Sequence, residues 1–161
     1  MKATGTWLGE YTYGAVYHDL VGRSVPFRLS LTESFLRRVV GYVRDDAQKG
    51  GQPERGRITG HRRGRTLTFV KTMPIGYLAD EDGRLVDKND WLQRTFGIED
   101  PRGPQHRIHY TGEFDADAQR IVGTWQIRST VAIESEDGVH VVGGGEGTWS
   151  ARRVSDLPSE V

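Results

Sequence analysis

The five histidines of this 161-residue chain are its best candidates for metal chemistry, since it has no cysteine to supply a thiolate ligand. His106 and His109 lie three residues apart in a predicted strand. Side chains at that spacing point to opposite faces, so the two cannot join one mononuclear site. We therefore predict no metal and no cofactor. A buried histidine could instead ligate a haem iron, an alternative that stays open for His18, His61, His109 and His140.

Groups for nucleophilic or acid–base catalysis follow no recognisable pattern. The chain has no Gly-x-Ser-x-Gly motif, and its glycine-rich run at 143–147 lacks a lysine and precedes a strand, unlike a phosphate-binding loop. An enclosed active site would need an ionisable side chain within it, for which Glu10, Glu33 and Glu113 are the candidates. We predict a binding protein and keep the enzyme as an alternative.

The segment from Arg55 to Arg65 is the one concentrated basic region. Its arginines offer paired donors for a phosphate or carboxylate, but a solvated hairpin balanced by acidic turns is the favoured interpretation. Lys plus Arg and Asp plus Glu each total 22, so the formal net charge is zero. Without a basic excess, we predict neither nucleic acid nor membrane as a partner.

Nothing in the sequence indicates export or a membrane span. No signal-peptide pattern precedes the first predicted strand. No apolar run approaches the ~20 residues that cross a bilayer. The expected location is therefore cytoplasmic.

The elements that must position these side chains are strands. Hydrophobic residues alternate with period two along most of the chain, most clearly at Val25, Phe27, Leu29 and Leu31. About eight such segments follow one another at roughly ten-residue spacing, which is typical of an antiparallel sandwich or barrel.

The tripeptide Gly-Thr-Trp occurs three times, at residues 5–7, 123–125 and 147–149. These are the first predicted strand, the one before the last, and the last. A Greek-key sandwich gives no reason for related first and last strands, whereas an up-and-down barrel makes them neighbours. We therefore predict an all-β, closed up-and-down antiparallel barrel of about eight strands. A three-residue turn at 136–138 would place Trp125 opposite Trp149, unless the glycines at 143–145 insert a bulge.

Residues 72–105 form a long connection with one short helix, which we expect to begin at Asn89 or Asp90 and to stop at Gly97. Connections of this length in compact domains are usually functional or mobile. We predict that it is a lid, with Trp91 and Phe96 packed over the barrel mouth. Residues 1–154 are then one domain, and residues 155–161 a flexible polar tail.

These features resemble the calycins, the superfamily of lipocalins, fatty-acid-binding proteins and avidins. The resemblance rests on Gly-Thr-Trp at 5–7 and on Gly-Thr-Trp at 147–149 followed by Arg152 and Arg153. In lipocalins a Gly-x-Trp on the first strand closes the barrel floor and a basic residue of the last strand covers that tryptophan. The resemblance implies that Trp7 closes the barrel here, that Arg152 or Arg153 covers it, and that the lumen holds a small molecule.

The expected ligand is a small, largely apolar or amphipathic molecule that the barrel binds without changing it chemically. Inward aromatic and apolar side chains would line its site, with tyrosines orienting it through their hydroxyls. The predicted ligand-binding residues are Tyr11, Phe27, Leu29, Tyr42, Phe69, Trp91, Phe96, Tyr110, Phe114, Trp125 and Trp149. A structural module with a packed interior, and a homodimer, stay open as alternatives.

Overall fold

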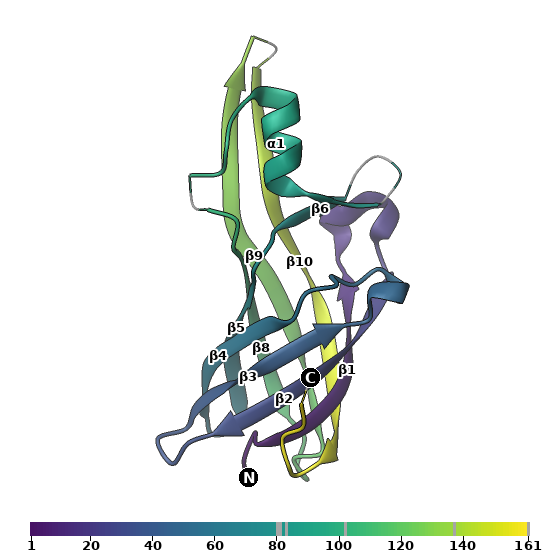
Figure 1. The fold of residues 1–161 in the computed structure, drawn as a ribbon. Helices are drawn as coiled ribbons and strands as arrows, with labels where there is room; N and C mark the ends of the chain where they lie inside the picture. Colours follow the sequence, from purple (N-terminus) through teal and green to yellow (C-terminus); the bar gives the residue numbers. More distant parts are fainter. Residues whose placement is uncertain (80–81, 83, 102, 137, 161) are drawn as a thin grey trace.

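The computed structural model describes residues 1–79, 82, 84–101, 103–136 and 138–160, without the side chains of residues 18, 79, 129–131, 135 and 140–142. Its main body is a closed antiparallel barrel in the order β1-β10-β9-β8-β5-β4-β3-β2 (Figure 1). The barrel strands are β1 (Gly5–Tyr13), β2 (Ser24–Glu33), β3 (Arg38–Asp45), β4 (Gly56–Arg63), β5 (Thr66–Met73), β8 (His106–Phe114), β9 (Arg120–Ser135) and β10 (Gly138–Ser155).

Closure is made by the first and last strands, as the repeated tripeptide predicted. β1 pairs with β10 over almost its whole length, with Tyr11 opposite Trp149 and Gly9 opposite Ala151. Eight antiparallel strands joined this way have the calycin architecture that the resemblance implied. The fold class is therefore confirmed.

Strand β3 corrects one predicted lumen residue. Both faces of this strand carry apolar side chains, so its sequence does not indicate which face points inward. Val39 and Val43 are buried, whereas Tyr42 is 42% exposed on the outer wall, where the Arg55 guanidinium lies 4.2 Å from its ring centroid. Tyr42 therefore does not line the lumen.

The predicted register of the last hairpin is also wrong. Gly147 lies opposite Trp125, and Trp149 lies opposite Gly123. Two features produce the shift: Gly138 pairs directly with Ser135, and the register changes again between residues 143 and 145. The glycine and tryptophan of the tripeptides at 123–125 and 147–149 thus pair reciprocally. Position 147 has to be a glycine, because a Cβ there would lie 2.6 Å from the Trp125 indole.

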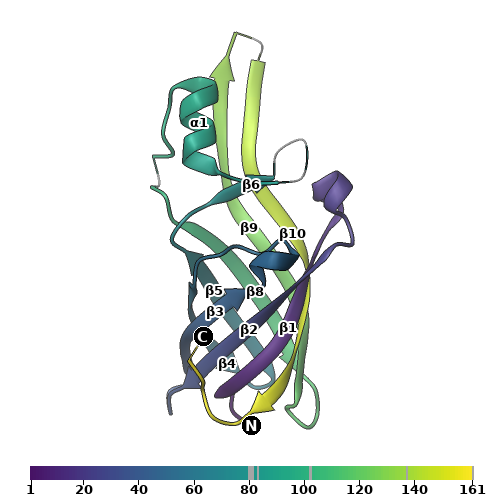
Figure 2. The same cartoon turned by 45° about the vertical axis from the view of Figure 1, so that its right-hand side comes forward.

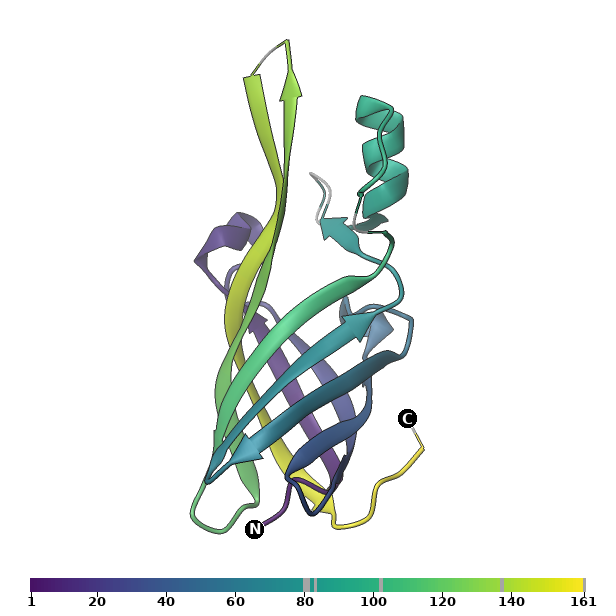
Figure 3. The same ribbon diagram turned by 90° about the vertical axis from the view of Figure 1, so that its left-hand side faces the viewer.

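Strands β9 and β10 continue beyond the barrel as a two-stranded extension, and the helix α1 (Lys88–Phe96) stands across from it at the same end of the molecule (Figure 3). The helix begins after Asp87, whose side chain accepts from two backbone amides, so the predicted cap was late by two or three residues. It ends at Gly97 as predicted. No helix in the described part of the chain has the length and apolar character to cross a bilayer.

Shorter elements surround the open end of the barrel (Figure 2). They are the 3-10 turns η1 (Ala15–Leu20) and η2 (Ala47–Lys49) and the small sheet of β6 (Tyr77–Ala79) and β7 (Leu85–Asp87). At the other end, the chain after β10 folds back along the outer wall. There the Thr6 hydroxyl donates to the Leu157 carbonyl at 2.8 Å and lies 3.1 Å from the Ser159 hydroxyl.

Candidate functional site

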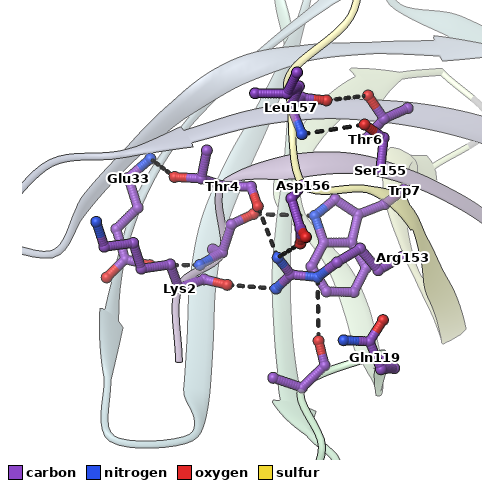
Figure 4. Close-up of polar contacts among 12 residues, drawn as sticks. Lys2, Thr4, Thr6, Trp7, Glu33, Gln119, Arg153, Ser155, Asp156 and Leu157 are labelled. Carbon is purple, nitrogen blue, oxygen red and sulfur yellow. Dashed lines mark hydrogen bonds and ion pairs between the residues drawn. The ribbon is translucent and has the colours of Figure 1, made fainter.

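The end of the barrel opposite α1 is closed by Trp7 and Arg153 (Figure 4). Trp7 is fully buried, packs edge-on against Phe114, and donates from its indole nitrogen to the Ala3 carbonyl at 3.0 Å. The Arg153 guanidinium lies 4.5 Å from the Trp7 ring centroid and donates to the carbonyls of Lys2, Thr4 and Ala118. Of the two arginines that the calycin resemblance offered, Arg153 covers the tryptophan. Arg152 is exposed.

An ion pair lies close to this floor. Arg62 donates to Glu33, with its Nη2 2.8 Å from Oε1. Burial would by itself raise the pKa of Glu33, but the hydrogen bonds from Arg62 and the Ala3 amide lower it below its ordinary value. Glu33 is therefore a structural carboxylate and does not face an enclosed site.

Aromatic packing fills the middle of the lumen. Phe69 and Tyr110 stack with ring centroids 4.8 Å apart, and Trp149 meets both of them edge-on at 5.5 and 5.6 Å. Five predicted ligand-binding residues belong to the packed core and do not line the cavity above it: Phe27, Leu29, Phe69, Phe114 and Trp149. The lower part of the barrel is thus core.

A cavity lies above this packed layer, near the open end. It offers about 70 Å³ to the centre of a water-sized sphere, which is room for several waters or one compact molecule. Three predicted ligand-binding residues line it, namely Tyr11, Tyr110 and Trp125. The other lining residues are Tyr13, Tyr17, Leu20, Asp45, Gln52, Lys71, Tyr77, Leu85, His106, Ile108 and Ile127. We refer to it as the inner cavity.

One wall of the inner cavity is aromatic. The centroid separations are 5.6 Å for Tyr11–Tyr13, 4.7 Å for Tyr13–Tyr17 and 5.8 Å for Tyr17–Trp125, so each ring holds the next. The Trp125 indole donates to the Thr12 carbonyl at 3.2 Å, which fixes its plane. Burial raises the pKa of Tyr11 and Tyr17, so both hydroxyls stay neutral at physiological pH.

A buried ion pair forms the polar part of the wall. Lys71 Nζ lies 2.6 and 2.7 Å from the two carboxylate oxygens of Asp45, and it lies 5.3 Å from the Tyr11 ring centroid. The two side chains are 3% and 1% exposed. Asp45 is on β3 and Lys71 is on β5, and the two side chains meet across Gly56 of β4, the strand between them. A larger residue would not fit at this position, because a Cβ there would lie 2.5 Å from the Met73 sulfur. Their charges therefore satisfy each other within the wall.

One polar atom at the inner cavity has no such partner. Gln52 Oε1 is buried and accepts no hydrogen bond from any residue that the structure describes. The Tyr110 hydroxyl also belongs to a side chain that lines this cavity, and burial raises its pKa well above the ordinary value. Buried polar groups normally have partners, so an unpaired acceptor beside a cavity is a place for a ligand donor.

The inner cavity adjoins a larger outer cavity, and Tyr17, Tyr77, His106 and Ile127 line both of them. The outer cavity measures about 390 Å³ on the same scale. Tyr77 is fixed by donating to Glu54 Oε1 at 2.7 Å, and burial, followed by Glu54, raises its pKa to about 12. The connection at 72–105 thus supplies walls to both cavities.

The predicted lid residues do not lie over these cavities. Trp91 and Phe96 pack against each other at 5.5 Å and join Leu78, Leu92 and Ile133 in a separate apolar cluster. The helix therefore rests on the β9–β10 extension. The buried ion pair of Lys88 and Asp100, at 2.5 Å, fixes the two ends of the helical segment to each other.

None of the predicted chemical groups gathers into a reactive centre. Glu10, Glu113 and His61 are exposed, and His109, whose pKa is lowered by burial and then by Arg128 and Arg107, is on the outward face of β8. The side chains of residues 18 and 140 lie outside the described part of the structure. Within that part, no three His, Asp or Glu side chains form a group that could hold a metal.

Several functional candidates were missed at the sequence level. Lys71 and Asp45 were not among the predicted site residues, although Lys71 alternates inward with Leu67 and Phe69 along β5. Tyr13 shares the frame of Tyr11 and could have been found in the same way. Gln52 and Tyr17 lie in irregular segments, where no periodicity indicates a direction.

Comparisons with known proteins give little beyond the fold. No family model and no curated protein sequence matches the chain. The chain is similar to a solved structure of a rhizavidin–biotin complex, with 15% sequence identity, a TM-score of 0.49, and 99% of this chain and 98% of that chain covered. This likeness is too distant to bear on the ligand.

Proposed function

We propose that the barrel reversibly binds one compact, amphipathic ring compound in the inner cavity, with the outer cavity as its entrance. The observation that supports this most directly is the unpaired Gln52 Oε1 beside a cavity lined by aromatic rings. A ligand that carries an N–H or O–H group would satisfy this acceptor.

Aromatic contact would supply much of the affinity. Tyr11, Tyr17 and Trp125 form a preformed wall, so a flat ring entering beside them need not order any side chain. Contacts between aromatic rings contribute about 0.5–1.5 kcal/mol each beyond the burial of their area. The size of the inner cavity restricts the site to molecules of one or two small rings.

Polar contacts would supply orientation. The amide oxygen of Gln52 is unpaired, and the neutral hydroxyl of Tyr110 would supply a second contact, whereas Asp45 and Lys71 already satisfy each other. A net hydrogen bond is worth about 1 kcal/mol, so Tyr110→Phe is expected to weaken binding about fivefold. The same variant keeps the ring that packs against Phe69 and Trp149.

The test combines a ligand panel with one blocked variant and its control. Native mass spectrometry of the purified protein would detect a retained ligand. Thermal unfolding would then be measured with indole, benzamide and 2-aminobenzimidazole, with toluene as the donor-free comparison. Ile127→Trp would place a larger side chain where Ile127 lines both cavities, whereas Gln126→Trp adds the same side chain to the outer face of the same strand.

We expect the ring compounds that carry an N–H donor to raise the melting temperature of the wild type and of Gln126→Trp. The melting temperature of Ile127→Trp should not change. Toluene is expected to stabilise less. The proposal would be wrong if no panel compound and no retained mass were found, or if ligands stabilised the blocked variant as strongly as the wild type.

A further inference from the structure

The turn between β2 and β3 exposes two adjacent bulky apolar side chains. Phe35 is 93% and Leu36 is 75% exposed, the two highest values among the described large hydrophobic residues. Single apolar residues on a surface are ordinary, but two neighbours at a projecting turn form a patch that water solvates poorly. Figure 1 shows this turn projecting at the end of the barrel that is remote from α1.

The turn is braced in a shape that keeps these side chains outward. The Ser34 amide donates to the Arg38 carbonyl at 2.9 Å, and the Arg62 amide of the neighbouring hairpin donates to the Arg37 carbonyl at 2.9 Å. Arg37 has a φ of 61°, an unfavourable conformation for a residue other than glycine. Strain that the surrounding structure maintains is often found at functional positions.

Basic side chains surround the patch. Arg37 and Arg38 follow it directly, and the β4–β5 turn that contacts it contributes His61, Arg63 and Arg65, all of them exposed. Among the residues that the structure describes, none of these four arginines lies within 4 Å of a carboxylate. The nearby Glu33 is already paired with Arg62. Arg37 also helps to lower the pKa of Glu33, so this carboxylate offsets part of the charge, and the five arginines leave a positive excess over it although the whole chain has a formal net charge of zero.

We propose that this end of the barrel is a membrane-docking tip, with Phe35 and Leu36 inserted among the acyl chains and headgroups of an anionic bilayer. A convex apolar turn with a basic rim matches such a surface in shape and in charge. An apolar protein pocket alone would leave these arginines without a counter-charge, which an anionic bilayer supplies over the whole rim. Residues that line the inner and outer cavities, such as Tyr77 and His106, belong to the other end of the barrel, so docking in this orientation would keep both cavities away from the bilayer.

The test is flotation of the purified protein with vesicles of phosphatidylcholine alone, or with about 30 mol % phosphatidylserine. We expect binding to the anionic vesicles, weakening as NaCl rises from about 0.05 to about 0.5 M. Phe35→Ser with Leu36→Ser should lower vesicle affinity at least about tenfold. The matched control replaces two exposed apolar residues elsewhere, Val122→Ser with Val139→Ser, and should bind as the wild type does.

A charge-reversal pair locates the electrostatic part. Arg38→Glu with Arg63→Glu at the tip should abolish the preference for phosphatidylserine. Arg28→Glu with Arg44→Glu makes the same change in charge near the open end of the same wall and should largely preserve it. Equal losses in the two pairs would overturn the location of the site. The proposal also fails if wild-type protein floats with no vesicle, or if the tip instead forms a dimer that Phe35→Ser with Leu36→Ser abolishes in sedimentation velocity.

Discussion

Replacing Lys71 with methionine probes the buried ion pair at the inner cavity. The lysine donates two hydrogen bonds to Asp45, and both side chains are almost fully buried. Lys71→Met keeps the stem but leaves a carboxylate without its partner. Breaking a buried pair in this way typically costs 3–5 kcal/mol. We take the low end, about 3 kcal/mol, because the pair borders a cavity that admits water.

For a chain of this length, about 3 kcal/mol corresponds to a fall of roughly 6–12 °C in melting temperature. Replacing both partners, as Asp45→Val with Lys71→Met, removes the charges together and should cost about 1 kcal/mol or less. The assay is urea unfolding at pH 7, followed by circular dichroism, with the exposed Arg57→Met as a surface control. The reasoning would be refuted if Lys71→Met lost less than about 1 kcal/mol, or if the double variant were less stable than the single one.

Two further perturbations test the closed end of the barrel. Burial would raise the pKa of Glu33, but the hydrogen bonds from Arg62 lower it. The ionised Glu33 therefore stabilises the fold above the unfolded pKa near 4.3, and this stabilisation is lost as the pH falls. Glu33→Gln should therefore cost about 2 kcal/mol at pH 7 and almost nothing near pH 3, measured by urea unfolding; a pH-independent cost would contradict this. Arg153→Ala should lower the free energy of unfolding, measured thermally, by about 3 kcal/mol, because it removes the cover of Trp7 and three hydrogen bonds to carbonyls. Arg152→Ala should lower it by less than about 0.5 kcal/mol. Equal effects of the two arginine variants would show that the cover contributes nothing.

The barrel could be predicted because its signals are local and repeated. Alternation along β2 identified the inward set Val25, Phe27, Leu29 and Leu31, all of which are buried. The related first and last strands indicated closure. The register of the last hairpin could not be predicted, because it depends on how many residues the turn and the glycine run leave unpaired.

The site was only partly predictable. Tyr11, Tyr110 and Trp125 were identified as inward aromatic residues, and all three line the inner cavity. An inward side chain borders the cavity only where the strands packed around it leave space, and those strands are distant in sequence. Phe69 and Trp149 point inward, but they are buried in the packed core beneath the cavity. The helix also lies where Ile133 of the β9–β10 extension offers an apolar surface, a tertiary contact that no local pattern encodes.

The most direct test of the proposed ligand site uses the four tryptophans as separate reporters. Their indole N–H signals in a ¹H–¹⁵N spectrum would be followed while the most stabilising panel compound is added. Trp125 lines the inner cavity, whereas Trp7 is at the closed end and Trp91 is on the helix. We expect the Trp125 signal to shift saturably, with Trp7 and Trp91 unmoved and no shift in Ile127→Trp. Saturable shifts at Trp7 or Trp91 with Trp125 unchanged would contradict binding in the inner cavity.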